Sequence, residues 1–421
     1  MMNKRLWAAA LSICIACTQL PPALAATLGP AETISDLRTM LDEAASGDTL
    51  LISGDVAMDR GEPLTCAASV LLASQSGETA TLRGLRLRDI SVSFSDIRLE
   101  DSLVVSGTST VHLARSARVR GRDGQSALSF TGSGTLIIDP GCVIEGISGG
   151  DGVSIQHTGG EFYGSIEGRV LGGSGDSGGT AVLISPLGDA GAVLVAGDIQ
   201  GGEGISLGGH ALDLYNLSGN AFVTVAGTLT GGSGFIGGDG VQLVSASDTV
   251  SVGINASVKG GAGQSYGGSA LILMNASDSS SFNLSGAFSG GNAIGEGSTP
   301  GTSLQLVGDD AVVRTRIDNC ILEEGRHLSA TPRPEIILTP EPTATPTAKP
   351  TATPAFHCEV TPLPEITSPA DNVAYIITPE PPRETPEPTP EAATEPTAEP
   401  SEAPPSEPAA EPDAPAGEDT E

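Results

Sequence analysis

Between Val153 and Phe288 the apolar residues of this chain recur with a period of 29 or 30 residues. Within each repeat they occupy every second position, which is the side-chain period of a β-strand with one buried face. One strand gives two columns across five repeats: Val153, Val182, Leu212, Val241 and Leu271, then Ile155, Ile184, Leu214, Leu243 and Leu273. Because a unit of this size cannot bury its apolar face alone, the pattern predicts a solenoid of stacked coils.

A second strand shows the same alternation in four repeats. Its columns are Val193, Val223, Val252 and Phe282; Val195, Val225, Ile254 and Leu284; Gly197, Gly227, Ala256 and Gly286; and Ile199, Leu229, Val258 and Phe288. The positions between the apolar residues vary and are expected to face outward. They are Leu183, Asp213, Gln242 and Ile272 in the first strand, and Leu194, Thr224, Ser251 and Asn283 in the second.

Glycine pairs open the repeats and indicate where the coil turns. They begin at Gly172, Gly201, Gly231, Gly260 and Gly290. We interpret them as sharp corners at which glycine adopts positive φ without a steric cost. The Gly-Gly-x-Gly openings lack the aspartate spacing of a calcium-binding nonapeptide, so no metal site is predicted.

The start of the chain predicts one helix before the coils. Residues 33–47 place Ile34, Leu37, Leu41 and Ala44 on one face. Thr33 and Asp36 have the spacing of a capping box, and Gly47 is expected to end the helix. Coils are then expected over residues 48–328, with a less regular period before Val153.

This arrangement resembles the right-handed parallel β-helix of pectin-lyase-like and adhesin-type bacterial surface proteins over roughly residues 33 to 328. The resemblance implies an all-β fold in which a short N-terminal helix covers the open first coil. It also implies that an enzyme of this kind would carry carboxylates, alone or with Arg or Lys, on adjacent coils of one outward strand, often with calcium.

Composition changes near residue 330. Of the 30 prolines 23 lie beyond it, whereas of the 56 glycines only Gly417 does. Residues 329–421 carry about half of the net charge of −31, and their Thr-Pro-Glu-Pro runs predict a disordered, extended acidic tail. Acidity in both parts argues against nucleic acid as a partner, because binding to phosphates needs Lys and Arg.

The N-terminus predicts export. Residues 1–25 combine Lys4 and Arg5 with an apolar stretch and a small-residue cleavage site before Ala26, as in a bacterial signal peptide. Lipidation at Cys17 is an alternative, although Cys14 stands where a large aliphatic residue is usual. We expect a secreted or cell-surface-associated protein with no membrane-spanning segment after cleavage.

The remaining cysteines do not indicate a metal or a disulfide framework. Cys66, Cys142, Cys320 and Cys358 are too scattered for a zinc pair, and Cys142 is interpreted as a buried thiol. No cofactor is expected.

One polar column has the composition of a catalytic triad. Thr180, His210, Asp239 and Ser269 follow the glycine turns of successive repeats. A nucleophile relay needs histidine between serine and aspartate, and here Asp239 lies in the middle. We therefore interpret His210 and Asp239 as an exposed contact rather than a catalytic pair.

Charged residues also gather in the irregular coils between Arg83 and Arg122. The catalytic candidates there are Asp96, Arg98 and Glu100, and their alternation with apolar residues also fits an ordinary charged outer face. Tyr215 and Tyr266 are scattered candidates for sugar binding. We expect a non-catalytic protein that presents a repetitive face for adhesion, or for binding a glycan, a partner or a neighbouring cell. The alternative is a polysaccharide lyase or glycoside hydrolase.

Overall fold

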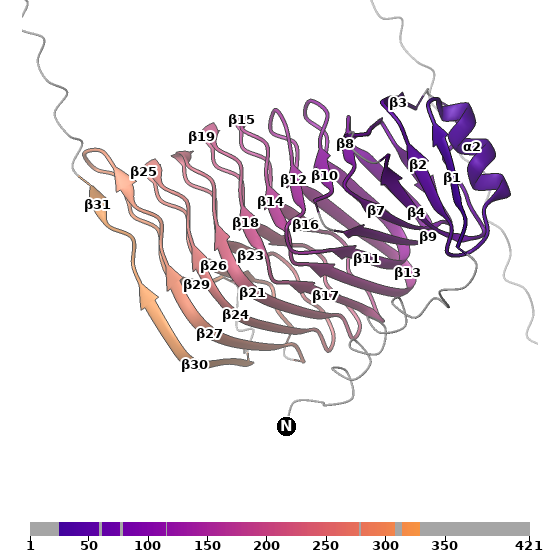
Figure 1. Ribbon diagram of the computed structural model, residues 1–421. Helices are drawn as coiled ribbons and strands as arrows, with labels where there is room; N and C mark the ends of the chain where they lie inside the picture. Colours follow the sequence, from indigo (N-terminus) through magenta and orange to yellow (C-terminus); the bar gives the residue numbers. More distant parts are fainter. Residues whose placement is uncertain are drawn as a thin grey trace, which may run out of the picture. The chain divides into compact units, whose positions relative to one another are not determined.

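The chain winds into a parallel β-solenoid, shown in Figure 1. The computed structural model describes residues 25–58, 61–75, 79–114, 116–277, 279–307 and 314–328. The predicted signal peptide, apart from Ala25, and the predicted tail lie outside these described residues. A regular coil passes in order through three strand positions, which we call wall 1, wall 2 and wall 3, and then through a separate outer sheet, which we call the fin.

Wall 1 carries the first predicted strand. Its strands are β6 (Arg86–Arg88), the first halves of β9 (Leu103–Ala114), β11 (Leu128–Ile138) and β13 (Val153–Ile166), then β16 (Val182–Ile184), β20 (Leu212–Leu214), β23 (Val241–Leu243), β26 (Leu271–Met274) and β29 (Leu304–Val307). The register pairs each predicted column residue with its counterpart in the next coil, so both wall 1 columns are confirmed.

Wall 2 follows wall 1 in each coil. It contains β1 (Thr27–Ala31), β2 (Thr49–Ile52), β4 (Ser69–Ser74), β7 (Ser91–Ser95), the second halves of β9, β11 and β13, then β17 (Gly191–Val195) and the first halves of β21 (Phe222–Thr230), β24 (Ser251–Lys259), β27 (Ser281–Ser289) and β30 (Arg314–Glu323). The predicted columns of Val193 and Val195 are confirmed in this wall.

The second predicted strand bends, so that its first half lies in wall 2 and its second half in wall 3. Wall 3 contains β3 (Asp55–Ala57), β5 (Thr81–Arg83), β8 (Arg98–Glu100), β10 (Arg118–Arg120), β12 (Val143–Glu145), β14 (Arg169–Leu171), β18 (Asp198–Gln200) and the second halves of β21, β24, β27 and β30. The corner lies at Gly227 and Gly286, both with positive φ. The column of Ile199, which follows the corner, is confirmed.

One outward residue was assigned to the wrong column. Gly253, not Ser251, pairs with Thr224 and Asn283. Ser251 lies two residues earlier in β24 and pairs with Phe222 and Ser281. Because residues two apart in a strand face the same side, Ser251 and Gly253 both face outward.

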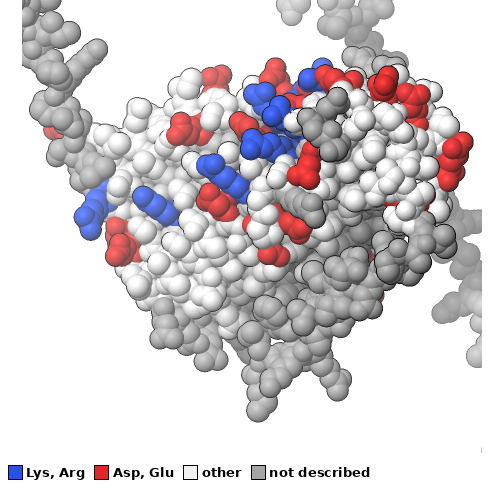
Figure 2. Space-filling model, viewed as in Figure 1, with Lys and Arg blue, Asp and Glu red and all other residues white. Residues whose placement is uncertain are grey.

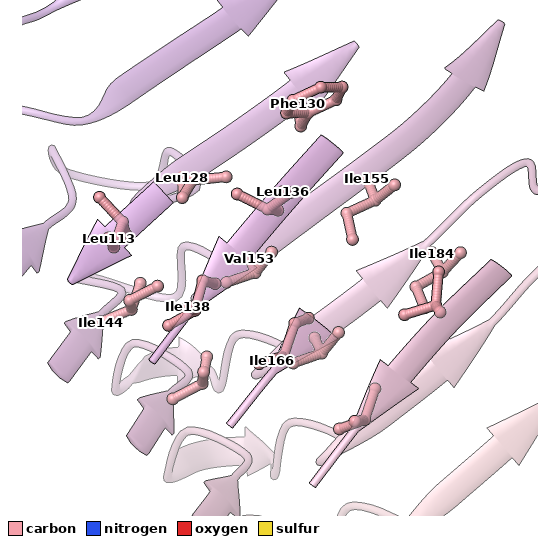
Figure 3. Packing of buried hydrophobic residues seen from close by; sticks show 14 of the residues in the cluster. Leu113, Leu128, Phe130, Leu136, Ile138, Ile144, Val153, Ile155, Ile166 and Ile184 are labelled. Atoms are coloured by element: carbon pink, nitrogen blue, oxygen red, sulfur yellow. The ribbon is translucent and has the colours of Figure 1, made fainter. Parts of the chain in front are cut away.

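The walls enclose one continuous apolar interior. In Figure 3, wall 1 residues such as Leu128 and Val153 and wall 2 residues such as Leu136 and Ile166 point into the same interior. Phe130 and Phe162 lie with ring centroids 5.2 Å apart. Each coil therefore buries the apolar edge of the next, as the repeat pattern predicts.

The predicted N-terminal helix is present but shorter. Helix α2 (Ile34–Glu43) begins after Thr33, whose hydroxyl forms the capping box with Asp36. Leu37 and Leu41 are buried in the core cluster, and Figure 1 shows α2 at the end of the solenoid beside β1 and β2. The helix ends at Glu43 rather than at Gly47, because Ala44 is extended and Asp48 accepts the backbone N–H of Ala45 at 2.8 Å.

The described cysteines form no disulfide with one another. Cys66 and Cys142 are buried, and Cys320 is partly buried. The thiol of Cys142 donates to the carbonyl of Leu113 at 3.1 Å. Burial, with the nearby charge of Asp139, raises the pKa of Cys142 to about 11. Cys358 lies outside the described residues.

Candidate functional site: a groove along the fin

The fin is a second, smaller parallel sheet built from short arms of the coils. Its strands are β15 (Gly175–Ser177), β19 (Gly204–Leu207), β22 (Gly234–Ile236), β25 (Gly263–Tyr266), β28 (Ala293–Ile294) and β31 (His327–Leu328). Figure 1 shows these arms side by side along the upper edge, at the labels β15, β19 and β25. Each arm leaves wall 3 and returns to wall 1, so the fin projects between those two walls.

Glycines at the base of each arm hold its two strands close together. A Cβ on Gly201 would lie 2.0 Å from the carbonyl oxygen of Gly209, and a Cβ on Gly231 the same distance from that of Gly238. Equivalent pairs are Gly172 with Gly179, Gly260 with Gly268, and Gly290 with Gly301. We call this base the neck.

The predicted role of the glycine pairs is therefore wrong. None of Gly172, Gly201, Gly231, Gly260 and Gly290 has positive φ. They are glycines because any side chain would overlap the backbone of the returning strand, not because the chain needs a left-handed corner.

Apolar side chains are exposed in register along the fin. Leu207 pairs with Ile236, and Ile236 pairs with Tyr266. Ile205 is 74% exposed, Tyr266 53% and Phe235 51%. Strands β19, β22, β25 and β28 contain no charged residue. Exposed large apolar side chains in register on neighbouring strands indicate an interaction site rather than scattered surface residues. Charged side chains flank this row, because Asp176 of β15 and Glu203 before β19 are exposed.

A groove of about 380 Å³ lies where the fin meets wall 1. Its volume is within the range of small-ligand sites. Its described lining comprises Ser177, Leu207 and Ile236 from the fin, Gly178, Gly208, Gly209, Gly237, Gly267 and Gly268 from the neck, Thr180, His210, Asp239 and Ser269 after the neck, and Ile272 and Gln305 from wall 1. The groove therefore has an apolar side and a polar side.

The polar side is a column formed by Thr180, His210, Asp239 and Ser269, which we call the ladder, and Asp239 contacts both of its neighbours in it. The carboxylate of Asp239 accepts the backbone N–H of Ser269 at 2.7 Å through Oδ1, and Oδ2 lies 3.3 Å from Nδ1 of His210. In an earlier coil Asp151 accepts the backbone N–H of Thr180 at 3.0 Å. The column predicted from the repeat spacing is thus assembled with Asp239 in its middle. The contact between His210 and Asp239 is partly buried and not exposed as predicted, because the fin covers it.

Burial and charge act in opposite directions on the histidine of the ladder. Burial lowers the pKa of His210, but the hydrogen bond to Asp239 and the negative charges of Asp239 and Asp213 outweigh it, so the pKa is raised. Asp213 lies on the adjoining outward column of wall 1, where its Oδ1 is buried without a hydrogen-bond partner. Burial raises the pKa of Asp213 despite the opposing effect of His210.

The ladder does not have the geometry of a nucleophile relay. Ser269 Oγ lies 3.0 Å from Thr302 Oγ1 and donates to Gln305 Oε1 at 3.4 Å, away from His210. Asp239 contacts both His210 and Ser269, so it separates the residues that a relay would need to join.

The other candidate residues lie on the outer surface. Arg98 is exposed and Glu100 half-buried on either side of buried Leu99 in β8, and Asp96 lies in the preceding turn with φ of 57°. Glu100 pairs in register with Arg83 of the previous rung. Figure 2 shows basic and acidic side chains interspersed over this part of wall 3. The structure therefore places Asp96, Arg98 and Glu100 on a mixed-charge outer face.

The two tyrosine candidates occupy different places. Tyr266 ends β25 and belongs to the exposed row of the fin, and Tyr215 follows β20. Neither tyrosine is among the described residues that line the groove. Cys17 lies outside the described residues. Sequence reasoning missed Ile205, Leu207, Phe235 and Ile236, although an available signal was an apolar segment enclosed by glycine pairs at both ends.

Comparisons with protein-family models, curated proteins and solved structures gave no match to this chain. The structure shows that the chain is a parallel β-solenoid. The resemblance to pectin-lyase-like or adhesin-type proteins rests on the sequence pattern alone. Among the described residues, no helix has the length and apolar character needed to cross a membrane.

Proposed function

We propose that this protein is a secreted, non-catalytic binding protein whose groove holds a linear, uncharged glycan at a cell surface. The observation that carries the proposal is the pairing of an apolar row on the fin with a polar ladder across the groove. Export rests on the predicted signal peptide of residues 1–25.

The groove suits a chain because a polar residue recurs at the same position of successive coils. Thr180, His210, Asp239 and Ser269 come from four successive coils joined by backbone hydrogen bonds. Neighbouring rungs of a sheet are about 4.8 Å apart, so the same kinds of contact recur along the solenoid axis. A ligand with a short repeating unit, such as a polysaccharide, meets one polar side chain of this column at each coil, although the side chains differ.

The two sides of the groove match the two surfaces of a sugar ring. Leu207 and Ile236 of the fin supply apolar contact for the C–H face of a pyranose. On the other side, the hydroxyl groups of Thr180 and Ser269 can both donate and accept, as a sugar hydroxyl can. Since Nδ1 of His210 contacts Asp239, Nε2 is the ring atom left for a ligand.

The charge of the groove favours a neutral ligand. Asp239 lines it, Asp213 and Asp151 lie beside the ladder, and no Lys or Arg occurs in its described lining. A uronate would bring further negative charge next to partly buried carboxylates with no compensating cation. An acidic polysaccharide is therefore disfavoured.

Other ligands and activities have less support. An extended peptide binds best at a free strand edge, whereas the fin and wall 1 strands beside the groove are already paired within their sheets. For a lyase or hydrolase, Arg98 and Glu100 would need to act from an exposed outer face, and no observation favours that role.

Binding to soluble hexasaccharides tests the proposal. Calorimetry would use neutral cello-, xylo- and mannohexaose together with hexagalacturonate. At least one neutral probe should bind and hexagalacturonate should not. Gln305→Ala should weaken binding by up to about tenfold, the effect of losing one hydrogen bond. The matched control is Gln242→Ala, because Gln242 shares the outward column of Gln305 but does not line the groove.

The row on the fin has its own test. The triple variant Leu207→Ser, Ile236→Ser, Tyr266→Ser should lose binding to glycan-coated beads and to bacterial cells. Val104→Ser and Tyr215→Ser remove similarly exposed apolar residues elsewhere and should bind like the parent chain. Retained binding by the triple variant, tighter binding of hexagalacturonate, or release of new reducing ends from any probe would overturn the proposal.

A further inference from the structure

Asp48 is a buried carboxylate that lies beside the first backbone nitrogen after the predicted signal peptide. It is 4% exposed, and its Oδ1 accepts the N–H of Ala26 at 2.8 Å while Oδ2 accepts that of Ala45 at the same distance. No described cationic side chain forms an ion pair with it. Amide hydrogen bonds do not neutralise a buried charge, and an unpaired charge is costly away from water.

The position of the Ala26 nitrogen is set by the sheet and not by a mobile side chain. The carbonyl of Ala26 accepts the N–H of Thr49 at 2.9 Å, and Thr27 pairs in register with Thr49. Asp48 directly precedes Thr49. The pairing of β1 with β2 therefore brings this nitrogen and this carboxylate together.

We infer that Asp48 is a docking site for the mature N-terminus. Hydrolysis of the Ala25–Ala26 peptide bond by a signal peptidase adds one water, leaving a carboxylate on Ala25 and an ammonium group on Ala26. The amide donor at 2.8 Å then becomes a cation, and Asp48 gains its counter-ion. Export processing thus completes an ion pair between a buried carboxylate and a partly accessible ammonium group beside the first coil, independently of what the groove binds.

The pair makes a pH-dependent contribution to stability. An α-amino group titrates near pH 7.7–8.0 when unperturbed, and its attraction to Asp48 raises that pKa in the folded chain. The contribution is therefore present in full below the unfolded pKa and is lost as pH rises through the folded pKa. Asp48 is the charged group that faces the Ala26 nitrogen in the described structure.

The experiment compares a chain beginning at Ala26 with a chain beginning at Ala25. One extra residue moves the amine by about 3.8 Å and restores an amide at Ala26. At about pH 7 the Ala26 chain should have the higher urea midpoint, and at about pH 10.5 the midpoints should converge, since the amine is then neutral. Asp48→Asn should abolish the difference between the two chains.

Equal midpoints at neutral pH, or a difference that persists with Asp48→Asn, would overturn the inference. If the Asn variants do not fold, nitrogen-15 NMR can measure the pKa of the Ala26 amine in the chain that begins at Ala26 and carries Asp48. A pKa above the unperturbed range supports the ion pair, and a pKa within or below that range contradicts it. Mass spectrometry of the exported chain must also give Ala26 as first residue, and a lipidated Cys17 would refute the site.

Discussion

Nδ1 of His210 lies 3.0 Å from the backbone nitrogen of Asp239 and 3.3 Å from its carboxylate oxygen Oδ2. Both contacts cannot use the same proton. A neutral ring accepts the backbone N–H through Nδ1, whereas a protonated ring donates from Nδ1 to the carboxylate. The ladder of the groove therefore changes one hydrogen bond when His210 titrates.

The pKa of His210 should fall when Asp239 is replaced by Asn. The variant removes the charge and the charge-assisted hydrogen bond that raise this pKa, while burial of the ring continues to lower it. An NMR titration of the His210 ring measures the change. Asp213→Asn is the matched control and should lower the pKa less, because Asp213 acts on the ring by charge alone. An unchanged pKa in Asp239→Asn would contradict this account.

His210→Gln should destabilise the chain more in mild acid than in mild alkali. Because the folded pKa of His210 is raised, its stabilising contribution is present below the unfolded pKa and disappears as pH rises through the folded pKa. Urea midpoints of the parent and variant chains across this range measure the difference. If the stability lost in His210→Gln grew with increasing pH, the raised pKa of His210 would be contradicted.

Gly201→Ala should destabilise the solenoid through the neck. The new methyl group would lie 2.0 Å from the carbonyl oxygen of Gly209, so the arm must open. Overpacking of this kind costs about 1–3 kcal/mol in the free energy of unfolding. Gly253→Ala is the control, since no heavy atom lies within 4 Å of its Cβ position and it has no positive φ, so its effect should stay below about 1 kcal/mol. Equal effects in the two variants would remove the packing explanation.

Phe162→Ala should cost about 3–5 kcal/mol, as expected for removing a fully buried aromatic ring. The ring packs against Phe130 and stacks near His157 at a centroid distance of 5.9 Å. Chemical denaturation measures the loss. Phe162→Leu keeps most of the volume and should cost clearly less. A loss below about 1 kcal/mol for Ala would mean that the coil collapses onto the cavity.

The thiol of Cys142 should resist alkylation near neutral pH while the chain is folded. Its pKa of about 11 leaves little thiolate, and it is buried. The measurement uses a mature chain in which Cys66, Cys320 and Cys358 are replaced by Ala, and follows iodoacetamide labelling by mass spectrometry. Labelling should become rapid only after denaturant is added. Rapid labelling of the folded chain would contradict the buried, protonated state.

Much of the solenoid could be predicted because its information is local and repeated. Val182 and Leu212 occupy equivalent positions in coils of nearly equal length, and burial of one face forces such residues into register. The same regularity predicted that His210 and Asp239 are neighbours. It also predicted the Thr33–Asp36 capping box, since that motif depends on residues three positions apart.

The fin and the groove were not predictable in this way. Ile205 and Phe235 lie in strands of three or four residues, too short to show an alternation, and glycines surround them. The glycine pairs were interpreted from backbone torsion alone, whereas their role at Gly201 and Gly209 depends on how close two strands approach. Such a distance exists only after both strands have folded.

The sequence by itself determined the walls of the coil. Apolar residues alternate within each strand, and the strands recur every 29 or 30 residues, so stacking of successive coils buries all of the apolar faces together. Only the tertiary structure decided which outward residues share a site. It set Leu207 across a groove from His210 and placed the nitrogen of Ala26 against Asp48. These contacts depend on the path of each arm and strand through space, which no spacing along the chain encodes.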